Sequence, residues 1–285
     1  MNTYNSIKYY KMNGLGNDFI IFDNRQEKIK ITKKLIQTIS NRELGIGCDQ
    51  VILIDNYRKN DIYMRIWNQD GKETTACGNA TRCVALKILE ERDSHSLKII
   101  TKSGELFCTK HDNKNIKVDM GIPRFKWEDI PLARKIDDTS AINYNFKIDN
   151  IKMLYPPSLV NIGNPHCILW VPNLETLNIR TIGSTIENDS LFPKKINVSF
   201  ANIKNSETID LIVWERGVGL TQACGTAACA TAVAASRINK TKREVEVNLP
   251  GGSLNIIWDK DDHIQMIGEA TFDYEDYLPK DLITT

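Results

Sequence analysis

Two cysteines of this sequence have matching neighbours and could transfer protons. Cys77 lies in Ala-Cys-Gly-Asn-Ala and Cys224 in Ala-Cys-Gly-Thr-Ala, 147 residues apart (224 minus 77). An alanine- and leucine-rich run follows each block, so we expect each cysteine at or just before a helix N-terminus. There the free backbone N–H groups and the helix dipole favour a thiolate and can also bind a carboxylate. We therefore expect both thiol pKa values to be lowered toward neutrality, next to an anion site.

A pair of such thiols suits the inversion of a carbon stereocentre. Inversion needs a base on one face of the carbon and an acid on the other, which a thiolate and a thiol supply. The sequence has no pyridoxal phosphate signature, so oriented amides would hold the charge that develops on a substrate carboxylate. We expect no cofactor and, because His and Cys nowhere have zinc-ligand spacing, no metal. From these residues alone, two buried structural cysteines remain an equal alternative.

The same offset relates further residues and indicates an internal duplication. The matching pairs are Trp67 with Trp214, Thr74 with Thr221, Gly16-Asn17 with Gly163-Asn164, Val51 with Val198, and Gly121 with Gly268. An approximate twofold axis between the halves would place Cys77 and Cys224 on opposite sides of one molecule bound in a cleft. The duplication thus predicts that the two cysteines act on the same bound molecule.

Both halves predict the same series of elements. In the first half we expect strands at 7–12, 19–22 and 50–54, a helix starting near 83, and closing strands within 97–109. In the second half we expect strands at 151–155, 167–170 and 210–214, a helix starting near 230, and closing strands within 244–258. The pattern predicts an α+β fold of two pseudo-symmetric domains, each a mainly antiparallel sheet around a buried central helix.

Composition favours a small ligand and argues against several classes of protein. Of the 285 residues 41% are hydrophobic, the net charge is +1, and no apolar run is long enough to span a membrane. We therefore expect neither nucleic acid nor membrane as a partner. The start of the sequence has no export signal, which predicts a cytoplasmic location. The odd number of cysteines argues against a disulfide framework. Five of them are expected in the core: Cys48, Cys83, Cys108, Cys167 and Cys229.

Six segments, in this order, resemble the diaminopimelate epimerase family. They are residues 11–19, 45–50, 76–79, 163–166, 214–217 and 223–226. The resemblance implies an enzyme that interconverts LL- and meso-diaminopimelate without a cofactor, in lysine and peptidoglycan precursor biosynthesis. It implies a homodimer with Tyr274 at the interface. It also implies domains at 1–123 and 124–269, with the tail 270–285 returning to the first.

The resemblance further assigns roles to residues. Cys77 would be the proton donor and Cys224 the proton acceptor, with His166 and Glu215 tuning the thiol pKa values. Substrate-binding residues would be Asn17, Gln50, Asn68, Gly78, Asn79, Asn164, Asn197, Glu215, Arg216, Gly225 and Thr226. A substrate with ammonium and carboxylate groups needs a forked cation and a carboxylate, which Arg216 and Glu215 provide. Spacing alone supports a hydrogen-bonded core histidine equally well for His166.

Three positions depart from the family pattern, and three other functions compete. Ala80 and Ala227 stand where glycine is frequent, and Leu220 where an acidic residue is common. One rival is an isomerase of the same duplicated fold, like proline racemase or a phenazine-pathway enzyme, which the Ala-Cys-Gly-Asn and Trp-Glu-Arg-Gly segments disfavour. Another is a thiol peroxidase or redox sensor, which peroxide consumption would reveal. The third is an amino-acid-binding protein, which would bind tightly without exchanging the α-proton.

Overall fold

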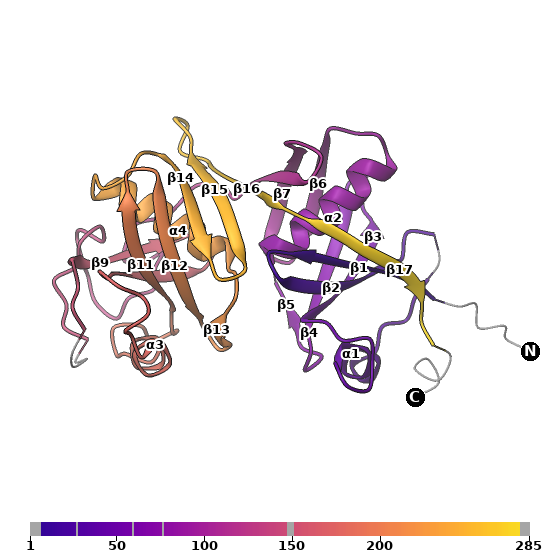
Figure 1. Ribbon diagram of the computed structural model, residues 1–285, viewed down its shortest axis with the longest axis horizontal. Coiled ribbons are helices and arrows are strands. Elements are labelled where there is room, and N and C mark those ends of the chain that lie inside the picture. Colours follow the sequence, from indigo (N-terminus) through magenta and orange to yellow (C-terminus); the bar gives the residue numbers. More distant parts are fainter. Residues whose placement is uncertain (1–6, 27, 59, 76, 147–150, 280–285) are drawn as a thin grey trace, which may run out of the picture. The chain divides into compact units, whose positions relative to one another are not determined.

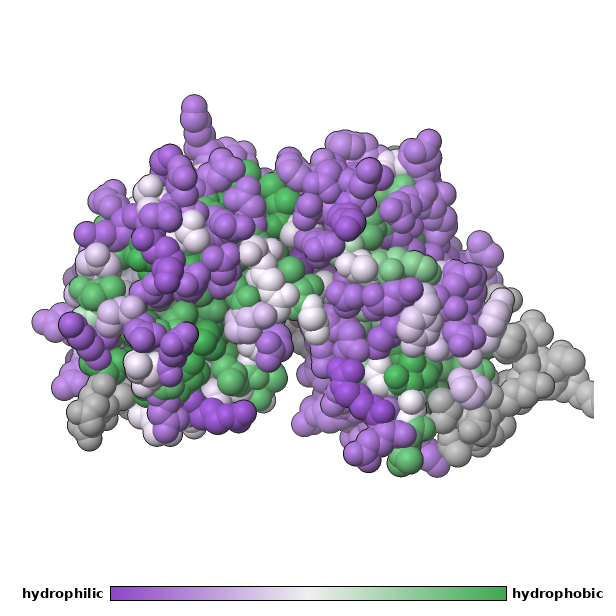
Figure 2. All heavy atoms as spheres, in the orientation of Figure 1, coloured by the Kyte–Doolittle hydropathy of each residue, from purple (hydrophilic) through white to green (hydrophobic). Residues whose placement is uncertain are grey.

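The chain forms two compact units in the computed structural model, which describes residues 7–26, 28–58, 60–75, 77–146 and 151–279 (Figure 1). Unit 1 comprises Met1–Val118 and Gly268–Thr285, and unit 2 comprises Asp119–Ile267. The sequence-based ranges, 1–123 with 270–285 and 124–269, stay a prediction about which segments fold on their own. Figure 2 shows that hydrophilic residues cover most of the visible face of both units. Among the described residues, no helix is long and apolar enough to cross a membrane.

Unit 1 is built from strands that surround one long helix. Its strands are β1 (Lys8–Gly14), β2 (Asn17–Asp23), β3 (Gln50–Asn56), β4 (Ile62–Asn68), β5 (Glu73–Thr74), β6 (Ser96–Thr101), β7 (Gly104–Lys110), β8 (Asn115–Asp119) and β17 (Thr271–Tyr277). Its helices are α1 (Lys33–Ser40) and α2 (Gly78–Glu91). Most neighbouring strands are antiparallel, whereas β2–β3 and β4–β6 are parallel. The C-terminal strand β17, yellow in Figure 1, pairs with β1.

Unit 2 repeats this plan. Its strands are β9 (Tyr155–Asn161), β10 (Pro165–Trp170), β11 (Asn197–Asn205), β12 (Thr208–Glu215), β13 (Gly219–Thr221), β14 (Glu244–Leu249), β15 (Gly252–Trp258) and β16 (Ile264–Glu269). Its helices are α3 (Ile179–Glu187) and α4 (Gly225–Arg237). The parallel pairs are β10–β11 and β12–β14, the counterparts of the two parallel pairs of unit 1.

The strand pairing shows that the two units have the same register at equivalent positions. Phe19 of β2 lies opposite Gln50 of β3, and His166 of β10 lies opposite Asn197 of β11. In the antiparallel pairs that follow, Val51 faces Trp67 and Val198 faces Trp214. Each of these residues matches its counterpart at the same 147-residue offset. The predicted duplicated α+β fold is therefore confirmed.

Each central helix is buried because strands pack around it. Helix α2 contacts β1, β2, β6, β7 and β17, and α4 contacts β9, β10, β11, β12, β14 and β15. Ten of the thirteen residues of α4 are buried, most of them alanine. Alanine favours the helix intrinsically and is small enough for strands to approach closely. The small-residue run following each Ala-Cys-Gly block thus forms the centre of a unit.

Several predicted element boundaries were wrong. Residues 151–154 form no strand; β9 begins at Tyr155 and continues through Pro156 and Pro157, where its pairing with β10 is irregular. The segment 210–214 belongs to β12, the counterpart of β4, whereas β11 corresponds to β3. Both central helices begin earlier than expected, at Gly78 and Gly225. Helices α1 and α3 were not predicted, although the side chains of Thr32 and Asn178 cap them.

Candidate active site

Both repeated cysteines occupy the N-cap of their central helix, as the sequence predicts. Cys77 precedes α2 with extended backbone angles (φ −152°, ψ 113°), and Cys224 precedes α4 with similar ones (φ −138°, ψ 108°). Neither cysteine side chain caps its helix, and neither first turn contains an acidic residue. Because the cysteine side chains do not cap the helices, they leave the first backbone N–H groups available. The helix dipole makes each of these helix ends suitable for binding an anion.

In unit 1 the structure brings Asn17, Cys77 and Asn79 together. The thiol of Cys77 donates to Asn17 Oδ1 over 3.7 Å, and Asn79 Nδ2 donates to the same oxygen over 3.4 Å. Gly78 is the first residue of α2, between the two. These side chains form the half-site of unit 1.

Two further predicted residues belong to the same end of the unit 1 sheet. Gln50 Nε2 donates to Asn68 Oδ1 over 2.9 Å, across the paired strands β3 and β4. Gln50 begins β3, which runs parallel to β2, and Asn17 begins β2. The starts of two parallel strands lie at one sheet edge, so Gln50 and Asn68 extend the half-site. Gln50 Oε1 is buried without a hydrogen-bond partner among the described residues, which leaves an acceptor for a ligand.

The half-site of unit 2 contains the counterparts of these residues. Thr226 Oγ1 lies 3.5 Å from Cys224 Sγ and accepts from Asn164 Nδ2 over 3.3 Å. Asn197 begins β11, and its Oδ1 accepts from the backbone N–H of Arg216 over 2.9 Å. The side chain of Arg216 is exposed and donates to the carbonyl oxygen of Lys194 over 3.3 Å. The guanidinium group of Arg216 is thus exposed, while its backbone N–H contacts Asn197 of the half-site.

Glu215 and Cys224 influence each other in a poorly solvated environment. Burial raises the pKa of Glu215, while hydrogen bonds from Thr221 and Cys224 partly offset this rise. Thr221 Oγ1 donates to Glu215 Oε1 over 2.7 Å. Burial, followed by the charge of Glu215, raises the pKa of Cys224 well above its ordinary value. The expected lowering of the Cys224 pKa was wrong, because loss of solvation outweighs the helix end.

His166 is a neutral side chain that holds Asn164. It is fully buried, and burial together with the charge of Arg216 lowers its pKa to about 3. Its Nε2 lies 2.8 Å from Asn164 Oδ1, whereas Nδ1 has no hydrogen-bond partner among the described residues. A neutral imidazole at this distance donates from Nε2. Tuning of the thiol by His166 stays a prediction, while its contact with Asn164 is direct.

Sequence reasoning missed residues that support these half-sites. Asp49 Oδ2 accepts from Asn17 Nδ2 over 2.8 Å, and the fully buried Arg82 donates to Asn79 Oδ1 over 3.0 Å. In unit 2, Glu187 accepts from Trp214 Nε1 and from the backbone N–H of Gly217, over 2.8 and 2.9 Å. Asp49 lies within the family-like segment 45–50, and Arg82 is a charge in an otherwise buried helix. These two signals could have identified them.

The remaining predicted residues lie outside the half-sites. Tyr274 is 44% exposed on β17, and its ring centroid lies 6.2 Å from that of Tyr9. Its place at a dimer interface stays a prediction. The five cysteines expected in the core are all fully buried, which confirms that expectation. Ala80 and Ala227 are fully buried as well, whereas Leu220 is exposed.

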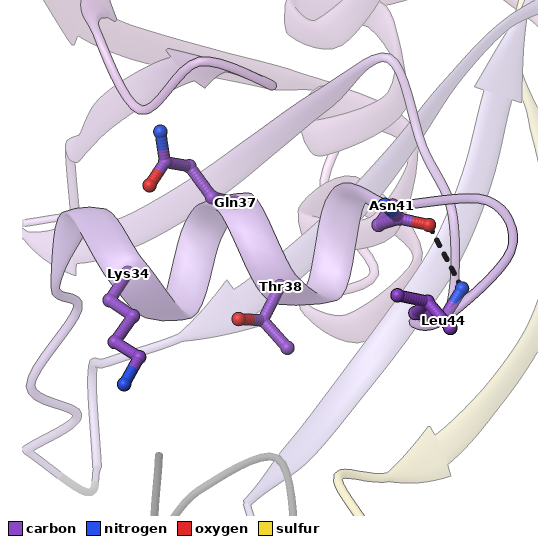
Figure 3. A pocket seen from close by; sticks show the side chains of 5 residues that line it. All are labelled: Lys34, Gln37, Thr38, Asn41 and Leu44. Atoms are coloured by element: carbon purple, nitrogen blue, oxygen red, sulfur yellow. Dashed lines mark hydrogen bonds between the residues drawn. The ribbon is translucent and has the colours of Figure 1, made fainter.

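A shallow pocket of about 240 Å³ contains none of the predicted residues. It is lined by Lys34, Gln37, Thr38, Asn41 and Leu44, on α1 and the loop after it (Figure 3). Asn41 Oδ1 accepts from the backbone N–H of Leu44 over 2.9 Å and so closes the turn. Of these five lining residues, Lys34 alone is titratable, so they provide no acid–base pair. The two cysteine half-sites are the better candidates for catalysis.

Solved structures share the fold of this chain at low sequence identity. A phenazine biosynthesis protein of the PhzF family from Bacillus anthracis is 17% identical, with a TM-score of 0.65, and the alignment covers 96% of this chain and 99% of that one. A hydroxyproline epimerase from Agrobacterium vitis is 11% identical, with a TM-score of 0.64 and coverage of 99% and 94%. At these identities the likeness concerns the fold alone.

Sequence comparison is more specific. The family model described as Diaminopimelate epimerase matches residues 9–126 and 158–273. The diaminopimelate epimerase of Erythrobacter litoralis is 45% identical over 279 residues, which cover 95% of this chain and 99% of the relative. That of Brucella melitensis biotype 1 is 42% identical over 270 residues, with coverage of 93% and 88%. With its duplicated fold and paired cysteine half-sites, the chain belongs to the diaminopimelate epimerase family.

Proposed function

We propose that this protein interconverts LL- and meso-diaminopimelate by proton transfer at the α-carbon, without a cofactor, using Cys77 and Cys224. The observation that carries this proposal is the pair of cysteines at the N-caps of two equivalent buried helices. Family membership supports the choice of substrate. The same product would serve lysine and peptidoglycan precursor biosynthesis.

In the proposed mechanism both half-sites close on one substrate in a cleft, with the two sulfur atoms on opposite faces of the α-carbon. The N–H groups at the starts of α2 and α4, around Gly78, Asn79, Gly225 and Thr226, hold the carboxylate as negative charge develops there. Arg216 and Glu215 supply the charged contacts. Neutral amides complete the site: Asn17, Gln50, Asn68, Asn164 and Asn197.

Protons then move in a balanced sequence. Cys224 passes its proton to Glu215, whose pKa is raised by burial and which lies close enough to receive it. The resulting thiolate removes the α-proton, so that the C–H bond breaks and an S–H bond forms on Cys224. Cys77 gives its proton to the opposite face of the carbon, which leaves Cys77 as the thiolate. The reverse reaction begins from that state.

Epimerisation in heavy water tests the proposal. Product formed from unlabelled LL-diaminopimelate is expected to carry deuterium at the inverted carbon, while substrate recovered early remains largely protiated. The donor thiol exchanges with solvent beforehand, whereas the acceptor holds the proton just removed. Cys77→Ala and Cys224→Ala should each stop inversion, with Cys108→Ala as the control. Near-normal rates in both single variants would contradict a two-thiol mechanism.

We also propose that the protein acts in the cytoplasm as a homodimer, with Tyr274 at the interface. The exposed strand β17, which carries Tyr274 and Phe272, supports this assignment. Light scattering coupled to gel filtration measures the molar mass directly. A monomer at micromolar concentration would contradict the dimer, and Tyr274→Glu should lower the mass if this residue lies in the interface.

A further inference from the structure

A charged network in unit 1 fixes the orientation of the Asn17 side-chain amide. Asp49 Oδ2 lies 2.8 Å from Asn17 Nδ2. An ionised carboxylate can only accept hydrogen bonds, so Asn17 must turn its NH2 group toward Asp49. The carbonyl oxygen of Asn17 then lies on the other side of the amide, where it meets Cys77 and Asn79.

Asp49 is itself held from two sides. Its Oδ1 accepts from Arg42 over 2.8 Å, and its Oδ2 also accepts from the backbone N–H of Asp18 over 3.1 Å. Asp18 accepts from Arg42 and from the buried Lys11. Burial opposes the charge of Asp18, yet these two cations outweigh it and lower the Asp18 pKa. Asp18 therefore keeps its charge at neutral pH, and its backbone N–H and Arg42 hold Asp49 in place.

The second neighbour of Asn17 favours the same orientation through a longer contact of 3.4 Å, compared with 2.8 Å to Asp49. Arg82 NH2 donates to Asn79 Oδ1, so Asn79 directs its own NH2 group toward Asn17. Asn17 Oδ1 thus receives a hydrogen bond from Asn79 and can only accept from Cys77. An acceptor facing a sulfur atom stabilises the thiol over the thiolate. Charged groups in the hydrogen-bonded contacts of this region include Lys11, Asp18, Arg42, Asp49 and Arg82, and Asp273 of β17 acts on the neighbouring Cys83 together with Cys77.

Unit 2 turns the equivalent amide the other way. At the same offset Ile196 replaces Asp49, and His166 instead donates to Asn164 Oδ1. The NH2 group of Asn164 therefore points to Thr226 Oγ1, 3.3 Å away. With that oxygen accepting from Asn164, the hydroxyl proton of Thr226 remains to donate to Cys224, 3.5 Å away. A donor facing a sulfur atom lowers the thiol pKa, and here it acts against the burial and the charge of Glu215, which raise the pKa of Cys224.

We propose that Asp49 is a positioning residue: by holding the Asn17 carbonyl toward Cys77 it keeps that sulfur protonated, so that Cys77 is the donor of the pair. The proposal rests on the proposed function, because it explains which member of the cysteine pair is the donor. The two half-sites differ in two places: a carboxylate and a histidine lie behind the equivalent asparagines, and Glu215 of unit 2 corresponds to Asn68 of unit 1. The first difference sets the orientation of the amide that faces each cysteine.

Alkylation of Cys77 by iodoacetamide, followed by peptide mass spectrometry across a pH series without substrate, tests this proposal. In Asp49→Ala the Asn17 amide can turn its NH2 group to the sulfur, so the midpoint of alkylation should fall by about one pH unit. In Asp49→Asn the amide oxygen can still accept from Asn17 and the Asp18 N–H, while the exposed Arg42 turns away from the new NH2 group, so the wild-type profile should remain. Asp55→Asn is the control, since Asp55 likewise accepts from an asparagine side chain, that of Asn24.

Two further variants separate positioning from simple charge. Asn17→Ala removes the acceptor without altering Asp49 and should lower the midpoint similarly, even if Asp49→Ala fails to fold. In the Asn17→Ala background, Asp49→Ala should have no further effect. Equal shifts in Asp49→Ala and Asp49→Asn, a shift that persists without Asn17, or no shift at all would each overturn the proposal. Because no substrate is present, a failed epimerisation assay would contradict the proposed function and leave this result independent.

Discussion

At the scale of single residues, the half-sites combine ordinary amides with a few groups whose chemistry depends on burial. Burial raises the pKa values of both Glu215 and Cys224 and so disfavours their ionised forms. His166 stays neutral for the same reason. Arg216, in contrast, is exposed and always charged. Each of these states predicts a different result on substitution.

Arg216→Lys keeps the charge but loses the forked geometry that fits a carboxylate. We expect kcat/KM to fall by a factor equivalent to about 2 kcal/mol or more, with the fold intact. Steady-state kinetics and circular dichroism measure both. Lys194→Arg, which leaves the carbonyl contact of Arg216 in place, is the matched control. Unchanged kinetics in Arg216→Lys would remove this side chain from the site.

Glu215→Gln should separate thiol reactivity from catalysis. The charge of Glu215 raises the pKa of Cys224, so its loss should speed Cys224 alkylation at a given pH. The variant also lacks a proton acceptor beside this sulfur, and epimerisation should fall by about 10² or more. Mass spectrometry and turnover measurements on the same preparation provide the comparison. Slower alkylation of Cys224 would contradict the charge effect, whereas alkylation of the buried Cys108 would indicate misfolding.

His166 should make unit 2 sensitive to acid. Its folded pKa of about 3 lies below the unfolded value of 6.5, so below pH 6.5 the unfolded chain binds a proton that the folded protein excludes. The free energy of unfolding should therefore fall as pH drops from about 6.5 toward 3, by at most about 1.4 kcal/mol per pH unit. Urea unfolding of His166→Gln, which still donates to Asn164, should have a flatter pH dependence.

His263 serves as the control for this experiment. A hydrogen bond to Asp119 raises the pKa of His263, so both folded and unfolded states are protonated well below pH 6.5. Any stability from this pair is present at low pH and is lost as pH rises through the raised pKa. His263→Gln should therefore leave the acid slope unchanged. A slope unchanged by His166→Gln would assign the acid sensitivity to other groups.

At the scale of elements, the part of the sequence that predicted most was the small-residue run after each Ala-Cys-Gly block. Those runs located α2 and α4, because a nearly uncharged helix must be surrounded by other structure. The segment 151–154 misled because its apolar residues resemble a strand, yet Met153 and Leu154 are partly exposed. Pro156 and Pro157 usually end strands, but a local irregularity accommodates them in β9. Tertiary context decided those boundaries.

The same limit applies to the site. The amides were identified by their position in repeated segments, whereas Asp49 and Glu187 act through contacts with residues 32 and 27 to 30 positions away. No local pattern encodes such contacts. Glu187 also belongs to α3, a helix that packs against β12 and was not expected. Asp49 and Glu187, which support the site residues, could therefore be identified only from the folded structure.

Gly183 of α3 makes this packing testable. A Cβ added there would lie 2.6 Å from Trp214 Cγ, an atom at the base of the indole that cannot simply swing away. Gly183→Ala should therefore destabilise the protein by about 1–3 kcal/mol, although alanine favours a helix. Ser184→Ala, on the exposed side of α3, is the matched control and should be neutral or slightly stabilising. Chemical denaturation measures both, and a stabilised Gly183→Ala would contradict this close packing.

At the scale of the whole molecule, one sequence pattern has produced two units with equivalent cysteines and different supporting groups. Unit 1 fixes its asparagine with a carboxylate inside a network of charges, and unit 2 fixes its asparagine with a neutral imidazole. In the proposed reaction each unit supplies one of the two cysteines. The proposed reaction therefore requires both units to act on one substrate molecule.

This requirement predicts a redox response. If both sulfur atoms act on one carbon, Cys77 and Cys224 lie close together in the working enzyme. A mild oxidant should then join them in a disulfide and abolish activity, and a thiol reductant should restore it. The other five cysteines are fully buried and should not react. Non-reducing peptide mapping identifies the bond, and Cys77→Ser should prevent it. An inactive, oxidised protein in which both cysteines remain thiols would count against the shared site.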